Sequence, residues 1–457
     1  MARWTSKLFE DIAVGDDVTL VHAVDAGDVE LIAMVTGDRV AMDRVRRTAA
    51  RSTQAVGAAV LVANAIGSRL PGPGSVILEE SLRCTGRITV GDVVTAMLRV
   101  RERRPEGRLV VLDVRCTNQR GEVIAEGETT VECPSERVSV EPLGEIDVAF
   151  HRYNAFVRLF ERCRGMPPVV TAVVHPCDRE SLLGAMEAAR RGLIVPVLVG
   201  PEARIRGVAA EHGVDLTGVR VVGTEHSHEA AARAVAMARA GEVEALMKGA
   251  LHTDELMSAV LSTTSGLRTD RRVSHVFVMD VPTYPKPLLI TDAAINIAPT
   301  LEDKVDICQN AIDLARVLGI ATPKVAVLSA VETVTPKIQS TVDAAALCKM
   351  AERGQITGGI LDGPLAFDNA ISAAAAEIKH IRSAVSGDPD VLLVPDLESG
   401  NMLAKQLAYL AAAESAGIVL GTRVPIALTS RADNARSREA STAVMALLAH
   451  ARRAASG

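Results

Sequence analysis

From about residue 167 onward, short apolar segments alternate with segments of helical length. The apolar segments are rich in Val, Ile and Leu, and each precedes a stretch rich in Ala, Glu, Arg and Leu. They include VVTAVV, IVPVLVG, EALMKG, VLLVPD and PIALTS. Because aromatic residues make up 2% of the chain, aliphatic side chains must build the core. The alternation predicts an α/β fold, in which helices cover both faces of a parallel sheet.

The first third of the chain has a different pattern. Residues 44–69 include AVGAAVLVANAIG, which is apolar on all sides and predicts a buried helix. Four strand-like segments follow it: SVILEESLRC, DVVTAMLRVRER, RLVVLDVRCTN and GEVIAEGETTVEC. We expect an antiparallel sheet around a central helix in residues 1–134 (α+β), a linker with a helix in 135–164, and the α/β domain in 165–457.

Charge and cysteine content exclude several classes of protein. A formal net charge of −6, without a long basic stripe, argues against nucleic-acid binding. None of the seven cysteines belongs to a CxxC pair, so we expect reduced thiols, and we predict no metal site. No uncharged apolar run of about 18 residues is present, so we expect no membrane segment and a cytoplasmic location.

Ligands of open α/β sheets bind beyond the carboxyl ends of the strands, which directs attention to PIALTSR. Thr429, Ser430 and Arg431 end this strand, and we expect a helix to begin near Ala432. Two hydroxyls, helix-terminal amides and a guanidinium together suit a phosphate or an acyl phosphate. On spacing alone, an ordinary helix N-cap followed by a surface arginine is the more frequent use of these residues.

Two further strand ends carry polar residues. Lys248 and Gly249 could supply charge and close backbone approach to a ligand, although a solvated lysine at a strand exit is the commoner case. Asp292 could serve as a base, with a helix cap as its alternative. Neither a GxGxxG nor a P-loop opens a helix, so no nucleotide cofactor is indicated. The lone histidines nearby (His175, His252 and His275) are interpreted as structural groups.

Seven segments, in this order, resemble the phosphate acetyltransferase and phosphate butyryltransferase family: MKGALHTDELMSAVL, RRVSHVFVMD, LLITDAAINIAPTLEDK, ATPKVAVLSAVETV, LDGPLAFDNAIS, VPDLESGNMLAKQL and PIALTSRADNARSR. The resemblance covers about residues 165–450 and is somewhat nearer to the butyryl branch. It implies a two-lobed α/β fold, an active site between the lobes, and a homodimer or larger homo-oligomer. The implied reaction is acyl-CoA plus phosphate to acyl phosphate plus CoA, without a cofactor.

In this family the CoA thiol attacks the acyl phosphate carbonyl after an acidic residue takes its proton, while a serine and arginines stabilise the developing charge. Ser430 and Arg431 match the family's serine–arginine pair. Acetyl-type relatives place the presumed aspartate base seven residues after that serine, where this chain has Ser437. We therefore predict Asp433 as the base, while Asp292 and Asp396 remain alternatives. The predicted substrate-binding residues are Lys248, Gly249, Arg272, Asp292, Asn296, Asn401 and Thr429.

Residues 8–135 resemble a MaoC-like hot-dog domain, the family of (R)-specific enoyl-CoA hydratases, through RLPGPG and CTNQRGEVIAEGE. Hydration in that family requires an aspartate and a histidine that activate a water. Asp38 matches the aspartate, but Asp43 stands where the family has the histidine, and Val56 replaces a second one. We expect hydratase activity to be lost or very weak. The alternatives are a bifunctional protein that retains it, and a non-catalytic acyl-CoA-binding protein.

Overall fold

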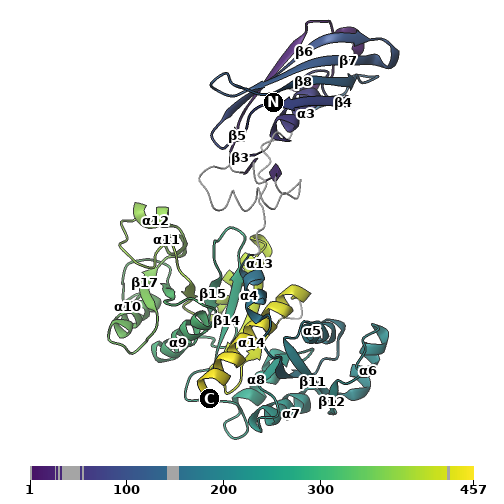
Figure 1. Cartoon of the computed structure of the whole chain (residues 1–457). Helices are drawn as coiled ribbons and strands as arrows, with labels where there is room; N and C mark the ends of the chain where they lie inside the picture. The colour runs from purple at the N-terminus through teal and green to yellow at the C-terminus, as the bar shows by residue number, and fades with distance from the viewer. Residues whose placement is uncertain are drawn as a thin grey trace. The chain divides into compact units, whose positions relative to one another are not determined.

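The computed structural model describes residues 3–25, 27–28, 31–32, 52–53, 56–141, 154–429 and 433–456. The chain forms two compact units, Met1–Val148 and Ala149–Gly457, and each is described by itself (Figure 1). Within the described residues, no helix is both long enough and apolar enough to span a membrane. All seven cysteines are free thiols.

The first unit contains a five-stranded antiparallel sheet. Its strand order is β2 (Asp17–Ala23), β6 (Val93–Arg104), β7 (Leu109–Thr117), β8 (Val123–Glu132) and β4 (Val76–Cys84). Helix α3 (Val56–Ser68) packs its Val62 and Ile66 into the same apolar core as residues of β6, β7 and β8. Alternate residues of β6 are buried, as expected of a strand with one face on a core.

Two short strand pairs complete this unit: β1 (Trp4–Thr5) with β9 (Ser139–Val140), and β3 (Ser52–Thr53) with β5 (Ile88–Thr89). Because Ser52–Thr53 is extended, the helix predicted within 44–69 does not include these two residues. It is also not buried on all sides, since Val60 is 52% exposed.

An eleven-stranded mixed sheet forms the second unit. Five strands form a first parallel half, in the order β12 (Arg220–Gly223), β11 (Ile194–Gly200), β10 (Val169–Val174), β13 (Ala245–Lys248) and β20 (Ile426–Ala427). Four form a second parallel half, in the order β15 (Leu288–Thr291), β18 (Val391–Leu393), β16 (Lys324–Leu328) and β17 (Ile360–Leu365).

Two antiparallel strands join these halves: β19 (Glu414–Leu420), which pairs with β20, and β14 (Ser274–Asp280), which pairs with β19 and β15. The prediction of a parallel sheet is therefore wrong for the centre of the sheet. Three successive antiparallel pairings reverse the strand direction, so the two parallel halves run in opposite directions.

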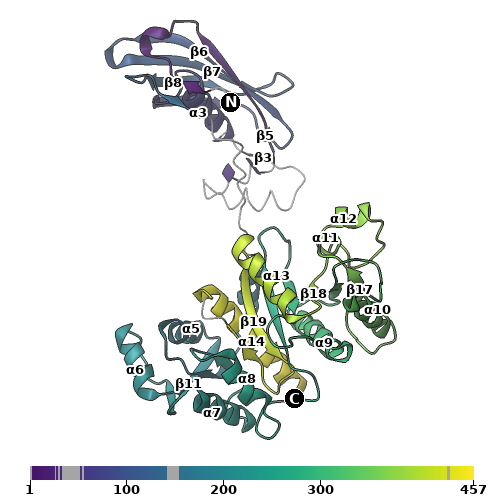
Figure 2. The same cartoon turned by 180° about the vertical axis from the view of Figure 1, so that it is seen from behind.

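Helices cover both faces of this sheet. One core contains residues of α4 (Asn154–Cys163), α5 (Arg179–Arg190), α6 (Glu202–Glu211), α9 (Leu301–Val317), α10 (Gln339–Glu352) and α14 (Ala435–Ser456). On the opposite face lie α7 (Ser227–Arg239), α8 (Thr253–Leu261), α11 (Phe367–Ile371) and α13 (Leu397–Leu410), and α12 (Ala373–Ile378) contacts α11. Accordingly, α14 lies in front of the strands in Figure 1, whereas α13 lies in front in Figure 2.

Helix α4 belongs to the second unit, although its residues fall within the predicted linker 135–164. Its Phe156 is almost fully buried in the core that includes α14. The carboxylate of Asp280, at the end of β14, accepts a hydrogen bond from the Phe156 N–H at 3.0 Å. The contact boundary between the units, at Val148 and Ala149, precedes this helix.

Candidate functional site

A first cluster of predicted site residues lies at the carboxyl ends of β13 and β20. The side chain of Lys248 is buried, and its Nζ donates to the main-chain oxygens of Thr429 at 3.3 Å and Gly249 at 3.5 Å. The alternative of a solvated lysine is therefore wrong. A Cβ on residue 249 would stand 2.4 Å from the oxygen of Val174, so only glycine fits between these strand ends.

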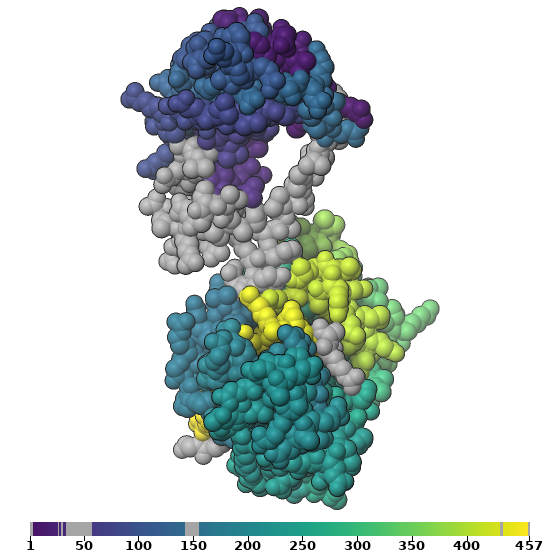
Figure 3. Space-filling model, turned by 90° about the vertical axis from the view of Figure 1, so that its right-hand side faces the viewer, coloured from purple at the N-terminus to yellow at the C-terminus, as the bar shows by residue number. Residues whose placement is uncertain are grey.

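Thr429 is buried, and its hydroxyl accepts a hydrogen bond from Nη1 of Arg438 at 3.1 Å. The N-cap of α14 is Asn434 instead, because its side chain accepts the Ser437 N–H at 2.8 Å. Thr429 is thus not the helix cap. Asp433 is partly exposed. In the space-filling view, yellow residues of α14 reach the surface between blue-to-teal residues of the second unit and yellow-green ones (Figure 3).

Several predicted residues lie outside the described part of the chain. These are Ser430 and Arg431 of the proposed serine–arginine pair, and Asp38 and Asp43 of the hydratase-like motif. Their roles stay predictions. The helix expected to begin near Ala432 begins at Ala435 instead. The serine–arginine pair lies between Thr429 and Asp433, which are the nearest described residues on either side.

A second cluster is built around Asp292, at the end of β15. Its Oδ1 accepts the N–H groups of Ala294 at 2.9 Å and Ile295 at 3.0 Å, and its Oδ2 accepts the side-chain amide of Asn296 at 2.5 Å. Burial raises the pKa of Asp292, while these donors oppose the rise. No helix starts here, since α9 begins at Leu301, so Asp292 stabilises a turn rather than a helix.

Asn296 links this turn to Arg272. The Oδ1 of Asn296 accepts Nε of Arg272 at 2.8 Å, and the Asp303 carboxylate lies 3.1 Å from Nη1 of Arg272. The Arg272 side chain is still 52% exposed, so its guanidinium is fixed in direction yet reachable by an anion. Asn401 joins the same cluster, because its amide donates to the oxygen of Ala293 at 3.1 Å.

The two clusters lie at different heights along the central strands. The Leu428 N–H donates to the main-chain oxygen of Gly417, and Gly417 pairs with Phe277 near the middle of β14. Ser274, at the start of β14, pairs with Leu420 at the end of β19. Arg272 precedes Ser274 by two residues. With ~3.4 Å per residue, Arg272 and Thr429 are separated by roughly 15–20 Å along the strands. The structure therefore places Arg272 apart from Lys248, Gly249 and Thr429, whereas Asp292 lies level with His275 on β14 and is nearer to Thr429 along the strands.

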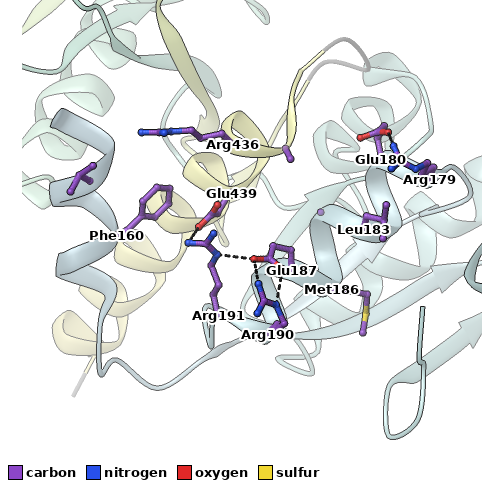
Figure 4. Close-up of a pocket in the computed structure, with 13 residues that line it drawn as sticks. Phe160, Arg179, Glu180, Leu183, Met186, Glu187, Arg190, Arg191, Arg436 and Glu439 are labelled. Carbon is purple, nitrogen blue, oxygen red and sulfur yellow. Dashed lines mark hydrogen bonds and ion pairs between the residues drawn. The ribbon is translucent and has the colours of Figure 1, made fainter. Parts of the chain in front are cut away.

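A groove of about 790 Å³ lies on the other face, between α4, α5 and the first turns of α14 (Figure 4). Apolar side chains such as Phe160 and Met186 line it together with arginines and glutamates. Arg191 forms ion pairs with Glu439 at 2.7 Å and with Glu187 at 2.9 Å. Glu187 also forms an ion pair with Arg190. Because neighbouring carboxylates neutralise these guanidinium groups, the groove lacks the excess positive charge that a phosphate site requires. None of the predicted site residues lines it.

Sequence reasoning treated two histidines beside the first cluster as ordinary structural groups. His175, at the end of β10, has a left-handed backbone conformation (φ 55°), and its main-chain oxygen accepts the Ala250 N–H. His275, on β14, is fully buried. Among the described residues, neither Nδ1 of His175 nor either ring nitrogen of His275 has a hydrogen-bond partner. The described side chains include no group of three or more His, Cys, Asp or Glu placed to hold a metal ion.

Comparisons with known proteins agree with this architecture. A family model described as "Phosphate acetyl/butaryl transferase" matches residues 224–446. A phosphate acetyltransferase of Rhizobium meliloti is 64% identical over 302 residues, which cover 66% of this chain and 96% of that protein. A phosphate butyryltransferase of Clostridium acetobutylicum is 38% identical over 288 residues, covering 63% and 95%.

Among solved structures, a branched-chain phosphotransacylase from Enterococcus faecalis aligns with a TM-score of 0.54 and 29% identity. The alignment covers 62% of this chain and 99% of that chain. The second unit thus defines the protein as an acyltransferase. More specifically, the chain belongs to the phosphate acetyl/butaryl transferase family, which confirms the family predicted from the seven sequence segments.

Proposed function

We propose that this protein transfers a short acyl group between CoA and inorganic phosphate. The single observation that carries the proposal is the 64% identity to a phosphate acetyltransferase over 96% of that enzyme's length. The identity to the butyryltransferase is 38%, so acetyl-CoA is the first substrate to test, in spite of the butyryl-like segments. The two parallel halves of the sheet would be the two lobes, with the substrates between them.

The proposed chemistry is direct attack. The sulfur of CoA forms a bond to the acyl carbon, the bond from that carbon to the phosphate oxygen breaks, and inorganic phosphate leaves with the electron pair. Ser430 and Arg431 would stabilise the charge that develops on these oxygens, and the buried Lys248 supports the strand end from which they follow. We propose that this chemistry requires neither a metal nor a prosthetic group.

The thiol proton must pass to a base, and we assign this role to Asp433. It is partly exposed and lies three residues after Ser430. The alternatives are Asp292, whose carboxylate is buried, and Asp396, which caps α13 by accepting the Ser399 N–H at 2.8 Å.

We propose that the first unit is a hot-dog domain without hydratase activity, since its sequence lacks the histidine that would activate water. Retained hydration and a purely acyl-CoA-binding protein are the alternatives. A homo-oligomeric state and a cytoplasmic location stay part of the same proposal.

The test measures phosphate-dependent release of free CoA from acetyl-, propionyl- and butyryl-CoA, with crotonyl-CoA hydration measured in parallel. We expect release without hydration. The Ser430→Ala variant should lose acyl transfer while its melting temperature is unchanged. Hydration without phosphate-dependent release would contradict the proposal for both units, and full activity of Ser430→Ala would remove the role of that serine.

A further inference from the structure

His275 lies between the two clusters of predicted site residues. It belongs to β14, and its neighbours Val276 and Val278 point into the core that contains α14, so its own side chain faces the opposite side of the sheet. Its main-chain N–H is one of the groups that oppose the rise in the pKa of Asp292, and its main-chain oxygen accepts the Thr291 hydroxyl at 2.9 Å. The backbone of His275 is therefore part of the Asp292 cluster.

The imidazole ring of His275 is neutral. Complete burial lowers the pKa of His275 to about 3, and no nearby charge contributes to the shift. A neutral imidazole carries one N–H donor and one acceptor nitrogen, and buried polar groups of this kind almost always have partners. Within the described chain, both nitrogens lack one. The fold thus keeps an unsatisfied donor and an unsatisfied acceptor in its interior, which reduces stability.

The ring is directed toward the end of β20. It contacts the ring of Phe277 edge-on, with 4.5 Å between centroids. The point where a Cβ of residue 417 would stand lies 3.0 Å from Nε2 of His275 and 2.2 Å from the main-chain oxygen of Leu428. Because residue 417 is glycine, no side chain separates the imidazole from the Leu428 carbonyl. A small displacement would bring this donor and acceptor into hydrogen-bond distance.

Leu428 is the last residue before Thr429, whose main-chain oxygen accepts Nζ of Lys248. A hydrogen bond that holds the Leu428 carbonyl in place would therefore also hold the neighbouring Thr429 carbonyl, to which Lys248 donates. His275 thus accepts the Thr291 hydroxyl with its main-chain oxygen beside the Asp292 turn, while its ring lies next to Gly417, which pairs with Leu428 at the end of β20.

We propose that His275 is a positioning residue for acyl transfer. This proposal rests on the function proposed above. Its Nε2–H donates to the main-chain oxygen of Leu428 when the substrates are bound, and this bond aligns the strand end that leads to Ser430. No proton is transferred, so the imidazole remains neutral throughout the reaction. An ordinary packed histidine with a trapped water would have no such effect on turnover.

The test compares three variants in the CoA-release assay: His275→Phe, His275→Gln and, as control, His450→Phe. Phenylalanine preserves the ring but removes both nitrogens, and glutamine restores a side-chain N–H near the place of Nε2. His450 lies on α14 and already has a partner, since its Nε2 lies 2.9 Å from the Pro167 oxygen. If the Phe variant is insoluble, His275→Leu provides the same removal of the nitrogens.

We expect His275→Phe to lower kcat at least tenfold, with the KM values for acyl-CoA and phosphate changed less than twofold and a melting temperature equal to or above that of the wild type. His275→Gln should recover part of kcat, and the ratio of wild-type to variant kcat should be constant from pH 6 to 9. Unchanged kcat in His275→Phe would overturn the proposal, as would a ratio that titrates near pH 6.5, which would indicate a proton-transferring histidine. A wild-type protein without CoA release would contradict the proposed function itself.

Discussion

Replacing Asn296 by aspartate exchanges one NH₂ group for an oxygen at the centre of the Asp292 turn. In the wild type this NH₂ group donates to the Asp292 carboxylate at 2.5 Å and to the Val273 oxygen at 2.9 Å. In Asn296→Asp the two carboxylates face each other inside the protein. Two like charges ~4 Å apart repel by about 4 kcal/mol at an effective dielectric of ~20, so one of the pair must remain protonated.

The sign of the pH effect follows from this protonation. In the unfolded chain both carboxyl groups ionise near pH 4. In the folded variant the pair retains a proton to a higher pH, so the folded state binds more protons than the unfolded state. The variant is therefore closest to the wild type below about pH 4, and it loses about 1.4 kcal/mol per pH unit as the pH rises from there to the raised folded pKa.

Thermal unfolding at pH 5, 6.5 and 8 measures this difference. At pH 8 we expect Asn296→Asp to melt roughly 8 °C or more below the wild type, based on about 2 °C per kcal/mol for a unit of this size. The matched control is Asn401→Asp, which loses a single bond to the Ala293 oxygen at a partly exposed position. It should lose about 1 kcal/mol with little pH dependence. Equal melting temperatures of Asn296→Asp and the wild type at pH 8 would refute the reasoning.

Three further predictions concern stability and thiol reactivity. Lys304 and Asp343 form a buried ion pair at 2.7 Å between α9 and α10; Lys304→Met should cost about 3–5 kcal/mol in denaturant unfolding, and adding Asp343→Leu should restore most of it. Two lysines lower the pKa of Asp388, so its stabilising effect is present above pH 4 and is lost as the pH falls through the lowered pKa; Asp388→Asn should flatten the pH dependence of the melting temperature between pH 5 and 3. Native protein should show one fast thiol toward a disulfide reagent, because Cys84 is exposed while the other cysteines are buried or partly buried; Cys84→Ser should remove it.

Local sequence patterns were sufficient for most elements of the sheet. VVTAVV and IVPVLVG form β10 and β11 because continuous β-branched runs suit strands that are buried on both faces. The central strands were missed as strands: SHVFVMD of β14 starts with Ser274 and His275 and ends with an aspartate. The antiparallel order at the centre depends on pairings between distant segments, such as β14 with β19, which no local pattern contains.

The candidate site could be predicted in part. The carboxyl-end rule identified Lys248 and Asp292, but their environments depend on long-range packing. Lys248 is buried because Thr429, 181 residues later, supplies its acceptor. Asp292 was considered as a base or a helix cap, whereas its position makes it the centre of a turn. A lone histidine carries no signal in one sequence, so the isolation of His275 required the structure.

The central position of β19 and β20 has a consequence for synthesis on the ribosome. Residues up to about 410 can form β10–β13 and β14–β18 as separate pieces, but β20 is the strand that pairs with β13, and β19 is the strand that pairs with β14. Until these last strands emerge, two sheet edges in the middle of the protein stay unpaired, which is the condition that favours association with other chains. The nascent protein therefore depends on residues 414–427 to close the sheet, and we expect chaperones to act mainly in the interval before these residues appear.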